Sequence, residues 1–416
     1  MERLFVCYVP AMDRRRIDPS TCPHVSQLFS DHPSVELETV PQIDHVPTLL
    51  TGAWPHQHGL WGPRLRPDAD RRTATQRLVD LLPDFVTTSA QGLAHLVSGP
   101  VELATLAPRR RRRFELLRFK FVKSFTPEKV LLLPLNGWDT IFTAVGAGNA
   151  RFGFVNDLGH LSARLDGVAR GDVALEWLEV HCLDEIQHWN LDDAALTAAG
   201  YRAVDDFVGR LHRKCRESGI GLLVLCDHGM ERVHRVIDLS AKLHALELDP
   251  EELDFFIEGS RATFWLHSGR AHSRVMGLLT SLEHGTALRN KELKQWGIEF
   301  ADNAYGDVYF VTDPGCSMAP SDFYQPLANA ISALTDRQQR PRLWRPHHRG
   351  EHGHLPQHPS ERGFMILADD AYAARNEPAR LVDVAPTIVS LLARRVPDGM
   401  AGRIVFRDGA PPPAHS

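Results

Sequence analysis

Short apolar runs, each followed by turn residues, recur along the chain. Continuous runs of this length are typical of β-strands that are buried on both faces, as in a parallel sheet covered by helices. The clearest are residues 4–9, 173–182, 221–226 and 364–367. Amphipathic stretches with helical spacing follow at 198–217 and 380–392. Strands that alternate with helices predict an α/β fold with a doubly wound, mostly parallel sheet.

Two regions interrupt this alternation, and we expect them to be insertions into a single domain over residues 1–416. Residues from about 65 to 135 are mostly helical in pattern and contain five consecutive arginines at 109–113. Such a run is able to bind a phosphate-rich partner, but more often it is a solvated helix end or loop. Residues from about 250 to 312 mix helix and strand signals, which predicts a small α+β subdomain that forms part of a lid.

Composition and charge narrow the class of protein. The 416 residues are 43% hydrophobic and 24% charged, with a formal net charge of -5. These values are typical of a globular protein, and the net charge gives no overall electrostatic attraction to nucleic acid or an anionic membrane. The N-terminal apolar run is too short for a signal peptide, and no stretch reaches the ~20 apolar residues that cross a bilayer. Six scattered cysteines without a CxxC pair favour reduced thiols. We therefore expect a cytoplasmic protein without a membrane or nucleic-acid partner.

Acidic residues and histidines follow the predicted strands at several points. One pair has the i, i+4 spacing that places both side chains on one helix face, in CLDEIQHWN. Because the carboxyl ends of parallel strands meet at one edge of the sheet, we expect these side chains to gather there. Carboxylates and imidazoles are the ligands of Zn²⁺ and similar ions, although each cluster alone also fits a capped turn. The candidates are Asp13, Asp184, His188, Asp227, His228 and His352.

In this order the clusters resemble those of the alkaline phosphatase superfamily, and most closely its nucleotide pyrophosphatase/phosphodiesterase-like branch. The passage VPTLLTGAWPHQHGLWG is similar to the family segment that contains TG, P and HG. The passage LVDVAPTIVSLLARRVPDGMAGR is similar to the family's C-terminal helix, DxAPTxxxLL, and the glycine-arginine turn after it. The resemblance extends from about residue 4 to 405, with gaps at the two insertions. DHGM and the C-terminal helix are its most specific parts.

The resemblance implies two divalent metal ions, usually Zn²⁺ at both sites and Mn²⁺ in some branches. It places Asp184, His188 and His352 around one ion. Asp227, His228 and Asp13 would surround the other. In the family the first acidic residue follows its strand immediately, whereas Pro10, Ala11 and Met12 intervene here. Asp18 is therefore the alternative to Asp13.

The position of the family nucleophile departs from the pattern. In the family a Thr, Ser or modified Cys lies nine positions before the Thr of the TG pair, and here that position is Gln42. A carboxamide is not a nucleophile at neutral pH. Three alternatives stay open. The alignment shifts so that Thr39, Asp44 or Thr48 serves; the metals activate water with Gln42 orienting it; or the chain is a catalytically altered relative.

Asp44 and His45 occupy the part of the segment where phosphodiesterase relatives carry an asparagine that holds the transferring group. His45 is able to donate a hydrogen bond to an oxyanion. Asp44 would repel a phosphoryl oxygen unless it pairs with a cation. An exposed turn is an equally good explanation of both residues.

These observations predict a metal-dependent hydrolase or transferase that acts on a small-molecule phosphate ester, phosphodiester or phosphonate through a two-metal site. The rival prediction is a catalytically altered or non-enzymatic relative that binds metal and a ligand or partner. A sulfatase is disfavoured because the CxPSR signature is absent.

Overall fold

The computed structural model describes most of the chain outside two long segments. It covers residues 1–41, 45–61, 137–168, 172–300, 305–322 and 347–409, the short stretches 64–65 and 115–116, and the single positions 83, 86, 303, 330, 334, 340 and 343. Gln42, Asp44 and nearly all of the predicted helical insertion, including the arginine run, lie outside the described residues. The chain divides into two compact units. The first comprises Met1–Gly59, Phe125–Met230 and Pro356–Ser416; the second comprises Leu60–Ser124 and Glu231–Leu355.

The first unit is built on a seven-stranded sheet. Across the sheet the strands are β18 (Ala379–Arg380), β2 (Ser34–Glu38), β16 (Arg362–Leu367), β7 (Gly221–Cys226), β1 (Leu4–Tyr8), β6 (Leu175–Val180) and β5 (Ala150–Val155). Only β16 runs antiparallel to its two neighbours, and all other pairs in this sheet are parallel. The prediction of an α/β fold with a mostly parallel sheet is confirmed.

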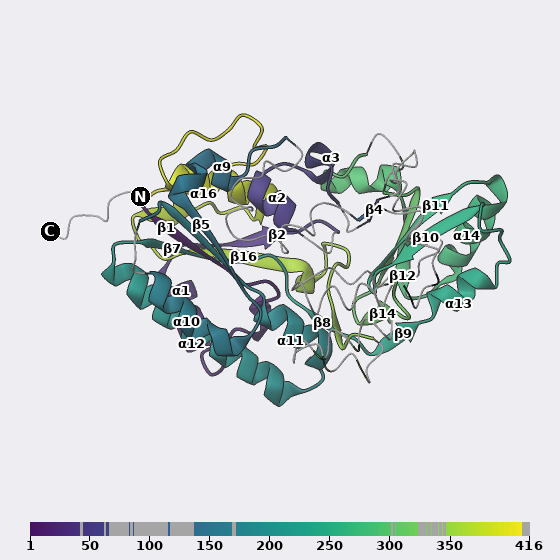
Figure 1. The fold of residues 1–416 in the computed structure, drawn as a ribbon, viewed down its shortest axis with the longest axis horizontal. Helices are drawn as coiled ribbons and strands as arrows, with labels where there is room; N and C mark the ends of the chain where they lie inside the picture. The colour runs from purple at the N-terminus through teal and green to yellow at the C-terminus, as the bar shows by residue number, and fades with distance from the viewer. Residues whose placement is uncertain are drawn as a thin grey trace. The chain divides into compact units, whose positions relative to one another are not determined.

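Helices cover both faces of this sheet (Figure 1). One face carries α1 (Pro23–Asp31), α10 (Leu161–Val168) and α12 (Ala194–Glu217), and the other carries α2 (Val46–Thr51), α9 (Ile141–Val145) and α16 (Val384–Leu391). The short helices α3 (Pro55–His58) and α11 (Cys182–Asn190) follow α2 and β6. Because helices cover both faces, every residue of β1 is buried, which explains its uninterrupted apolar run.

The two passages that carry the family resemblance pack against each other. Gly52 and Gly59 end α2 and α3 in the left-handed region, with φ of +61° and +73°. A Cβ on Gly52 would lie 2.9 Å from Pro386 Cδ, so only glycine permits the close approach of α2 to α16. Just before α16, the buried carboxylate of Asp383 accepts backbone N–H bonds from Arg380 (2.9 Å) and Arg403 (2.8 Å). These motif residues therefore fix the position of α2, which His45 immediately precedes.

The second unit contains a four-stranded antiparallel sheet. In order its strands are β10 (Leu253–Ile257), β11 (Arg261–Leu266), β13 (Val308–Thr312) and β12 (Gly285–Arg289). Apolar residues of this sheet form one core with α13 (Leu239–His244) and α14 (Gly269–Ser281). Strand and helix signals thus alternate in 250–312 because the segment folds as a sheet with a helix on it. Its role as a lid stays a prediction.

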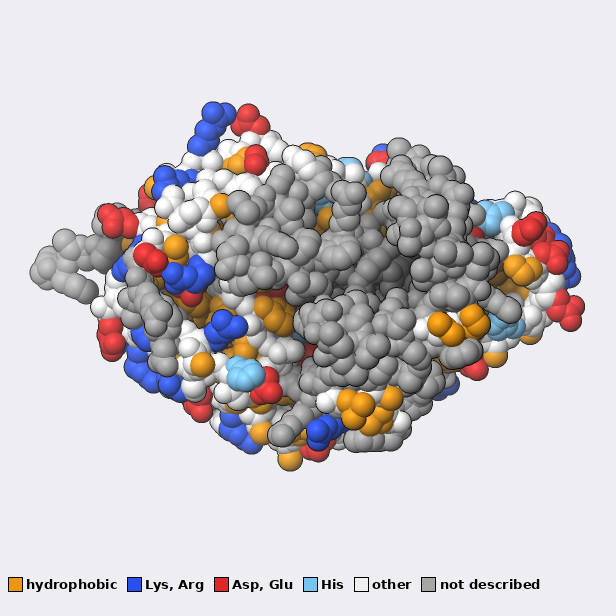
Figure 2. Space-filling view, viewed as in Figure 1, with side chains coloured by type: hydrophobic (Ala, Val, Ile, Leu, Met, Phe, Trp, Pro, Cys, Tyr) orange, Lys and Arg blue, Asp and Glu red, His pale blue; other side chains and the backbone are white. Residues whose placement is uncertain are grey.

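The remaining described strands form two-stranded ribbons. These are β14 (Cys316–Met318) with β9 (Arg235–Ile237), β15 (Gly350–Glu351) with β8 (Glu231–Arg232), β17 (Tyr372–Ala374) with β19 (Phe406–Asp408), and β3 (Arg64–Leu65) with β4 (Glu115–Leu116). In the part of the chain that the structure describes, no helix has both the length and the apolar character to span a membrane. On the face drawn in Figure 2, the described basic and acidic side chains are interspersed.

Candidate metal centre

The carboxyl ends of three adjacent strands place the predicted ligands of the first unit. Strands β7, β1 and β6 are neighbours and run parallel, so their carboxyl ends lie at the same edge of the sheet. Asp227 and His228 directly follow β7, Asp13 follows β1, and Asp184 follows β6 on the first turn of α11. This placement follows the general rule for open α/β sheets, in which ligand groups gather at the carboxyl ends of strands.

The tightest cluster at this edge consists of His45, Asp227 and His228, and we call it the Asp227 group. Their donor atoms all lie within 4.8 Å of one another, and the three side chains are at most 2% exposed. Asp227 Oδ2 is 3.1 Å from His45 Nδ1 and 3.5 Å from His228 Nε2. His45 immediately precedes α2, so the packing of α2 on α16 holds its ring in place. The structure thus brings Asp227 and His228 together with His45, which the sequence had suggested for oxyanion contact.

Both imidazole rings of the Asp227 group are oriented by backbone carbonyls. His228 Nδ1 lies 2.7 Å from the Gly229 carbonyl oxygen, and His45 Nε2 lies 3.3 Å from that of Val40. A ring nitrogen beside a carbonyl is the N–H donor, which leaves the other nitrogen of each ring to face Asp227. In neutral rings these nitrogens carry lone pairs, and lone pairs directed at a carboxylate require a cation between them. A proton on a ring meets this requirement for that ring alone, and a divalent metal ion meets it for both rings at once.

The electrostatics of the Asp227 group also favour an ionised carboxylate. Burial raises the pKa of Asp227, but the charge of His228 and the close contact with His45 lower it by more, to about 2. The Tyr8 hydroxyl donates a further hydrogen bond to Oδ2 at 2.8 Å. Burial lowers the pKa of His45, but the hydrogen bond and charge of Asp227 outweigh it and raise that pKa. One carboxylate and two imidazoles are a donor set that Zn²⁺ and Mn²⁺ accept, so these residues fit a divalent ion.

A second cluster surrounds Asp184. His188 Nε2 lies 3.6 Å from Asp184 Oδ2, as the i, i+4 spacing on a helix predicts. His181 Nε2 lies 3.2 Å from the same oxygen, and its Nδ1 lies 3.3 Å from Oε1 of the buried Glu179. The sequence reasoning missed Glu179 and His181. Their signal was the run of acidic residues and histidines across the end of β6, in EVHCLD.

His352 belongs to the second unit and directly follows β15. Its side chain is buried, and the Ser260 hydroxyl donates a hydrogen bond to its carbonyl oxygen at 2.5 Å. Nearby in the same unit, His348 Nδ1 lies 3.0 Å from Glu351 Oε1, and His354 Nδ1 lies 3.0 Å from the Thr312 carbonyl oxygen. The assignment of His352 to the ion of Asp184 and His188 stays a prediction.

The structure does not bring Asp13 into a candidate ligand group. Its Oδ2 accepts from Arg15 Nη2 at 2.7 Å, and its Oδ1 accepts from Arg15 Nε at 3.0 Å and from the Arg15 backbone N–H at 2.9 Å. The alternative, Asp18, is exposed and caps a turn through Ser20, whose hydrogen bonds lower the pKa of Asp18. Within the described residues, no group of potential metal ligands includes either aspartate.

The two threonines considered as alternative nucleophiles are both engaged. The Thr39 hydroxyl donates to the Glu361 carbonyl oxygen at 2.7 Å. Thr48 Oγ1 lies 3.1 Å from His58 Nε2, and both side chains are fully buried. Burial and the charge of His56 lower the pKa of His58 to about 3, so its ring is neutral and shares a hydrogen bond with the Thr48 hydroxyl. Gln42 and Asp44, as stated above, lie outside the described residues.

Solved structures share the architecture of the whole chain. Murine ectonucleotide pyrophosphatase/phosphodiesterase 5 (ENPP5) aligns with a TM-score of 0.61 and 15% identity, covering 95% of this chain and 96% of that chain. An inactive variant of the murine protein in complex with AMP aligns with a TM-score of 0.60 and 14% identity over 95% and 96% of the two chains. Human ENPP5 aligns with a TM-score of 0.61 and 13% identity over 94% and 95%.

No protein-family model matches the sequence, and no curated protein does. At identities of this size the likeness concerns the fold. The chain therefore has the ENPP-like, alkaline phosphatase-type fold that the sequence resemblance implied.

Proposed function

We propose that this protein is a metal-dependent hydrolase or transferase of small phosphate esters, phosphodiesters or phosphonates. The observation that carries the proposal is the Asp227 group, in which two imidazoles turn their ligand nitrogens toward one ionised, buried carboxylate at the carboxyl end of β7. The fold likeness to ENPP5, one structure of which holds AMP, supports a phosphorylated ligand.

Each residue of the Asp227 group has a distinct task in this proposal. Asp227 supplies the negative charge that retains a divalent ion, and His45 and His228 complete its coordination. Tyr8 and the backbone carbonyls of Val40 and Gly229 hold the three ligands in position. Asp184 and His188, with His352, are proposed ligands of a second ion. When bound, Zn²⁺ or Mn²⁺ supplies Lewis-acid activation of the phosphoryl group.

The proposed attacking group is water. The hydroxyls of Thr39 and Thr48 are committed to hydrogen bonds inside the fold, and Thr48 is fully buried. Gln42 stands where the family carries its nucleophile, and its carboxamide is suited to orient a water molecule through both a donor and an acceptor. Hydrolysis would then proceed without a covalent phospho-enzyme.

One observation favours the second candidate, a metal-binding relative that has lost turnover. The carboxylate of Asp13 is held by the guanidinium of Arg15, so the side chain expected to join Asp227 and His228 as a ligand is already paired with a cation of the chain itself. A site that lacks this ligand retains fewer anchors for a reacting phosphate.

The test combines elemental analysis of purified protein with hydrolysis of bis-p-nitrophenyl phosphate and p-nitrophenyl phosphate, with and without EDTA. About two metal ions per chain and turnover that EDTA abolishes would support the hydrolase. Asp18→Asn, which changes an exposed carboxylate outside the site, serves as the matched control and is expected to keep both properties. Metal without turnover on either substrate would favour the second candidate, and absence of metal would contradict both.

A cytoplasmic location is part of the proposal. The six cysteines are free and buried in the fold, as expected of reduced thiols.

A further inference from the structure

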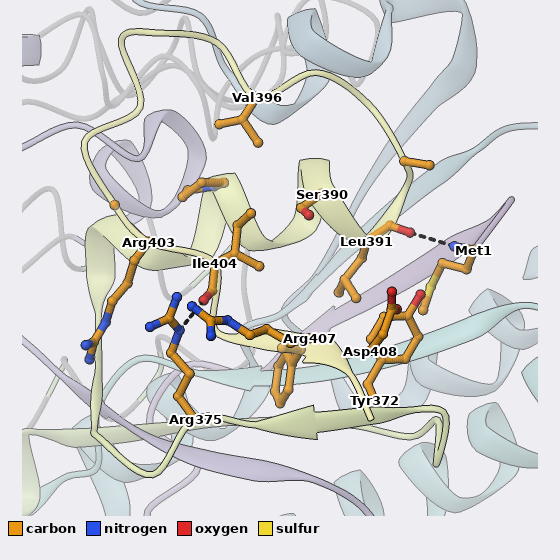
Figure 3. Close-up of a pocket in the computed structure, with 14 residues that line it drawn as sticks. Met1, Tyr372, Arg375, Ser390, Leu391, Val396, Arg403, Ile404, Arg407 and Asp408 are labelled. Atoms are coloured by element: carbon orange, nitrogen blue, oxygen red, sulfur yellow. Dashed lines mark hydrogen bonds between the residues drawn. The ribbon is translucent and has the colours of Figure 1, made fainter. Parts of the chain in front are cut away.

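The first unit contains a pocket that the proposed function does not use. It has a volume of about 690 Å³ and lies between the β17–β19 ribbon, α16 and the loop after α16 (Figure 3). Met1, three residues before β1, also lines it. The pocket is therefore at the amino end of β1, whereas the Asp227 group lies at the carboxyl end of the neighbouring parallel strand β7. The two sites occupy opposite edges of the sheet.

Three arginines line this pocket, and they are not equivalent. Arg403 is an internal anchor, because its guanidinium forms ion pairs with Glu377 and Asp383. Arg375 donates from Nε to the Ile404 carbonyl oxygen at 2.7 Å, which fixes its side chain and leaves both terminal nitrogens directed elsewhere. The guanidinium of Arg407 makes no hydrogen bond or ion pair with any residue that the structure describes. Arg375 and Arg407 thus bring two positive charges to the pocket. Neither forms an ion pair among the described residues, although the charge of Arg375 also lowers the pKa of Glu377.

The strand register places these two charges on the same face of the ribbon. Arg407 lies opposite Ala373, and the Arg375 backbone N–H bonds the carbonyl oxygen of Val405, so Arg375 and Arg407 are diagonal neighbours. Figure 3 draws the two guanidinium groups pointing toward one another. Like charges in this arrangement repel, and a bound anion removes the repulsion. Paired guanidinium forks match the oxygens of a phosphate group.

The rest of the lining suits an organic group attached to that anion. Leu391, Val396 and Ile404 form apolar wall, and the hydroxyls of Tyr372 and Ser390 add two possible donors. Asp408 is the single acidic residue among the lining residues. In the ribbon it lies opposite Tyr372, whereas Arg407 lies opposite Ala373.

We propose that this pocket binds a small phosphate monoester, with Arg375 and Arg407 holding the phosphate and the apolar wall contacting the organic part. This site is separate from the Asp227 group, and its occupation does not depend on the proposed hydrolysis.

Methyl NMR of isoleucine-labelled protein reports on the pocket through Ile404, whose side chain lines it. Ile186, on α11, packs near Gly200 of α12 and serves as a reference signal outside the pocket. AMP, adenosine and inorganic phosphate are titrated in the presence of EDTA, so that metal-dependent hydrolysis does not consume the probe. AMP is expected to shift the Ile404 signal in a saturable way, more tightly than inorganic phosphate, and adenosine is expected to leave it in place.

Two charge-removing variants complete the test. Arg407→Gln removes an exposed guanidinium that bonds no described side chain, so the fold is expected to survive, and AMP binding should weaken at least tenfold. Arg395→Gln makes the same charge change at a site 86% exposed, where the arginine pairs with Asp398 and with no other residue that the structure describes, and AMP binding should stay as in the wild type. Wild-type affinity of Arg407→Gln for AMP, an equal response of Ile404 to adenosine, or an Ile404 signal that AMP does not move would overturn the proposal. Hydrolysis of p-nitrophenyl phosphate should be unchanged in Arg407→Gln.

Discussion

Asp13 and Asp227 follow adjacent parallel strands of the same sheet, and both are buried, at 1% and 2% exposure. Their surroundings differ in kind. Asp13 faces the guanidinium of Arg15, a permanent cation that reaches both carboxylate oxygens. Asp227 faces two imidazoles and a phenol, none of which is a permanent cation. We therefore propose that a strand-end position alone does not make an aspartate a metal ligand, because the charge of its partners decides whether a further cation is needed.

The difference originates in short-range geometry. Arg15 is two residues from Asp13, so its guanidinium reaches the carboxylate within one turn of the chain. Before it, Ala11 has a φ of +59°, a left-handed conformation that directs the chain away from the strand. The partners of Asp227 come from β1 and from the residue before α2, and their backbone carbonyls fix which ring nitrogen faces the carboxylate.

The largest expected effect is that of Asp227→Asn. The substitution removes the only carboxylate of the Asp227 group while keeping its shape, so two neutral rings would face an amide. Metal affinity should fall by more than the roughly 10–100-fold that loss of an outer hydrogen-bond partner causes. Metal content after dialysis and chelator competition measure this. Retention of metal at wild-type affinity would contradict the assignment of Asp227 as a ligand.

Tyr8→Phe should have an intermediate effect. It deletes the hydroxyl that donates to Asp227 Oδ2 and leaves the aromatic packing, so metal affinity should fall roughly 10–100-fold. Competition with a chromophoric chelator gives the affinity. The matched control is Tyr201→Phe, another fully buried tyrosine, whose hydroxyl contacts the Asp13 backbone and Gln187 instead. Equal losses in the two variants would mean that Tyr8 acts through general packing.

Asp13→Asn should have the smallest effect on metal and a measurable effect on folding. The charge-assisted bonds from Arg15 are lost, and because that side chain is 38% exposed the free energy of unfolding should fall by only about 1–2 kcal/mol. Urea denaturation measures this loss, and metal affinity should stay within about threefold of the wild type. If Asp13→Asn instead released metal, Asp13 would be the ligand that the sequence resemblance implied.

Much of the fold was predictable because apolar runs and helical periodicity are local signals. Residues 221–226 coincide with β7, and the helix expected at 198–217 begins four residues earlier, at Ala194, where Asp193 caps it through a hydrogen bond to the Leu196 N–H. The direction of β16 was not predictable from its apolar run, because parallel and antiparallel central strands are both buried on two faces.

The site was predictable only in part, since its contacts join residues distant in sequence. The DHGM motif indicated Asp227 and His228 as candidates, but nothing local reveals that His45 lies 3.1 Å from Asp227 across 182 positions. Tyr8 has the appearance of an ordinary strand residue until its hydroxyl is placed beside Asp227. The ion pair of Asp13 with Arg15 was within reach of the sequence, because DRRR places three cations directly after the aspartate.

The central claim is that His45, Asp227 and His228 hold a divalent metal ion. X-ray absorption at the metal edge tests it most directly, on wild-type protein and on His228→Ala. The account predicts a wild-type spectrum with imidazole and oxygen ligands at about 2.0–2.2 Å, and a weaker imidazole contribution in the variant. A protein without bound metal, or a wild-type spectrum that His228→Ala leaves unchanged, would contradict it.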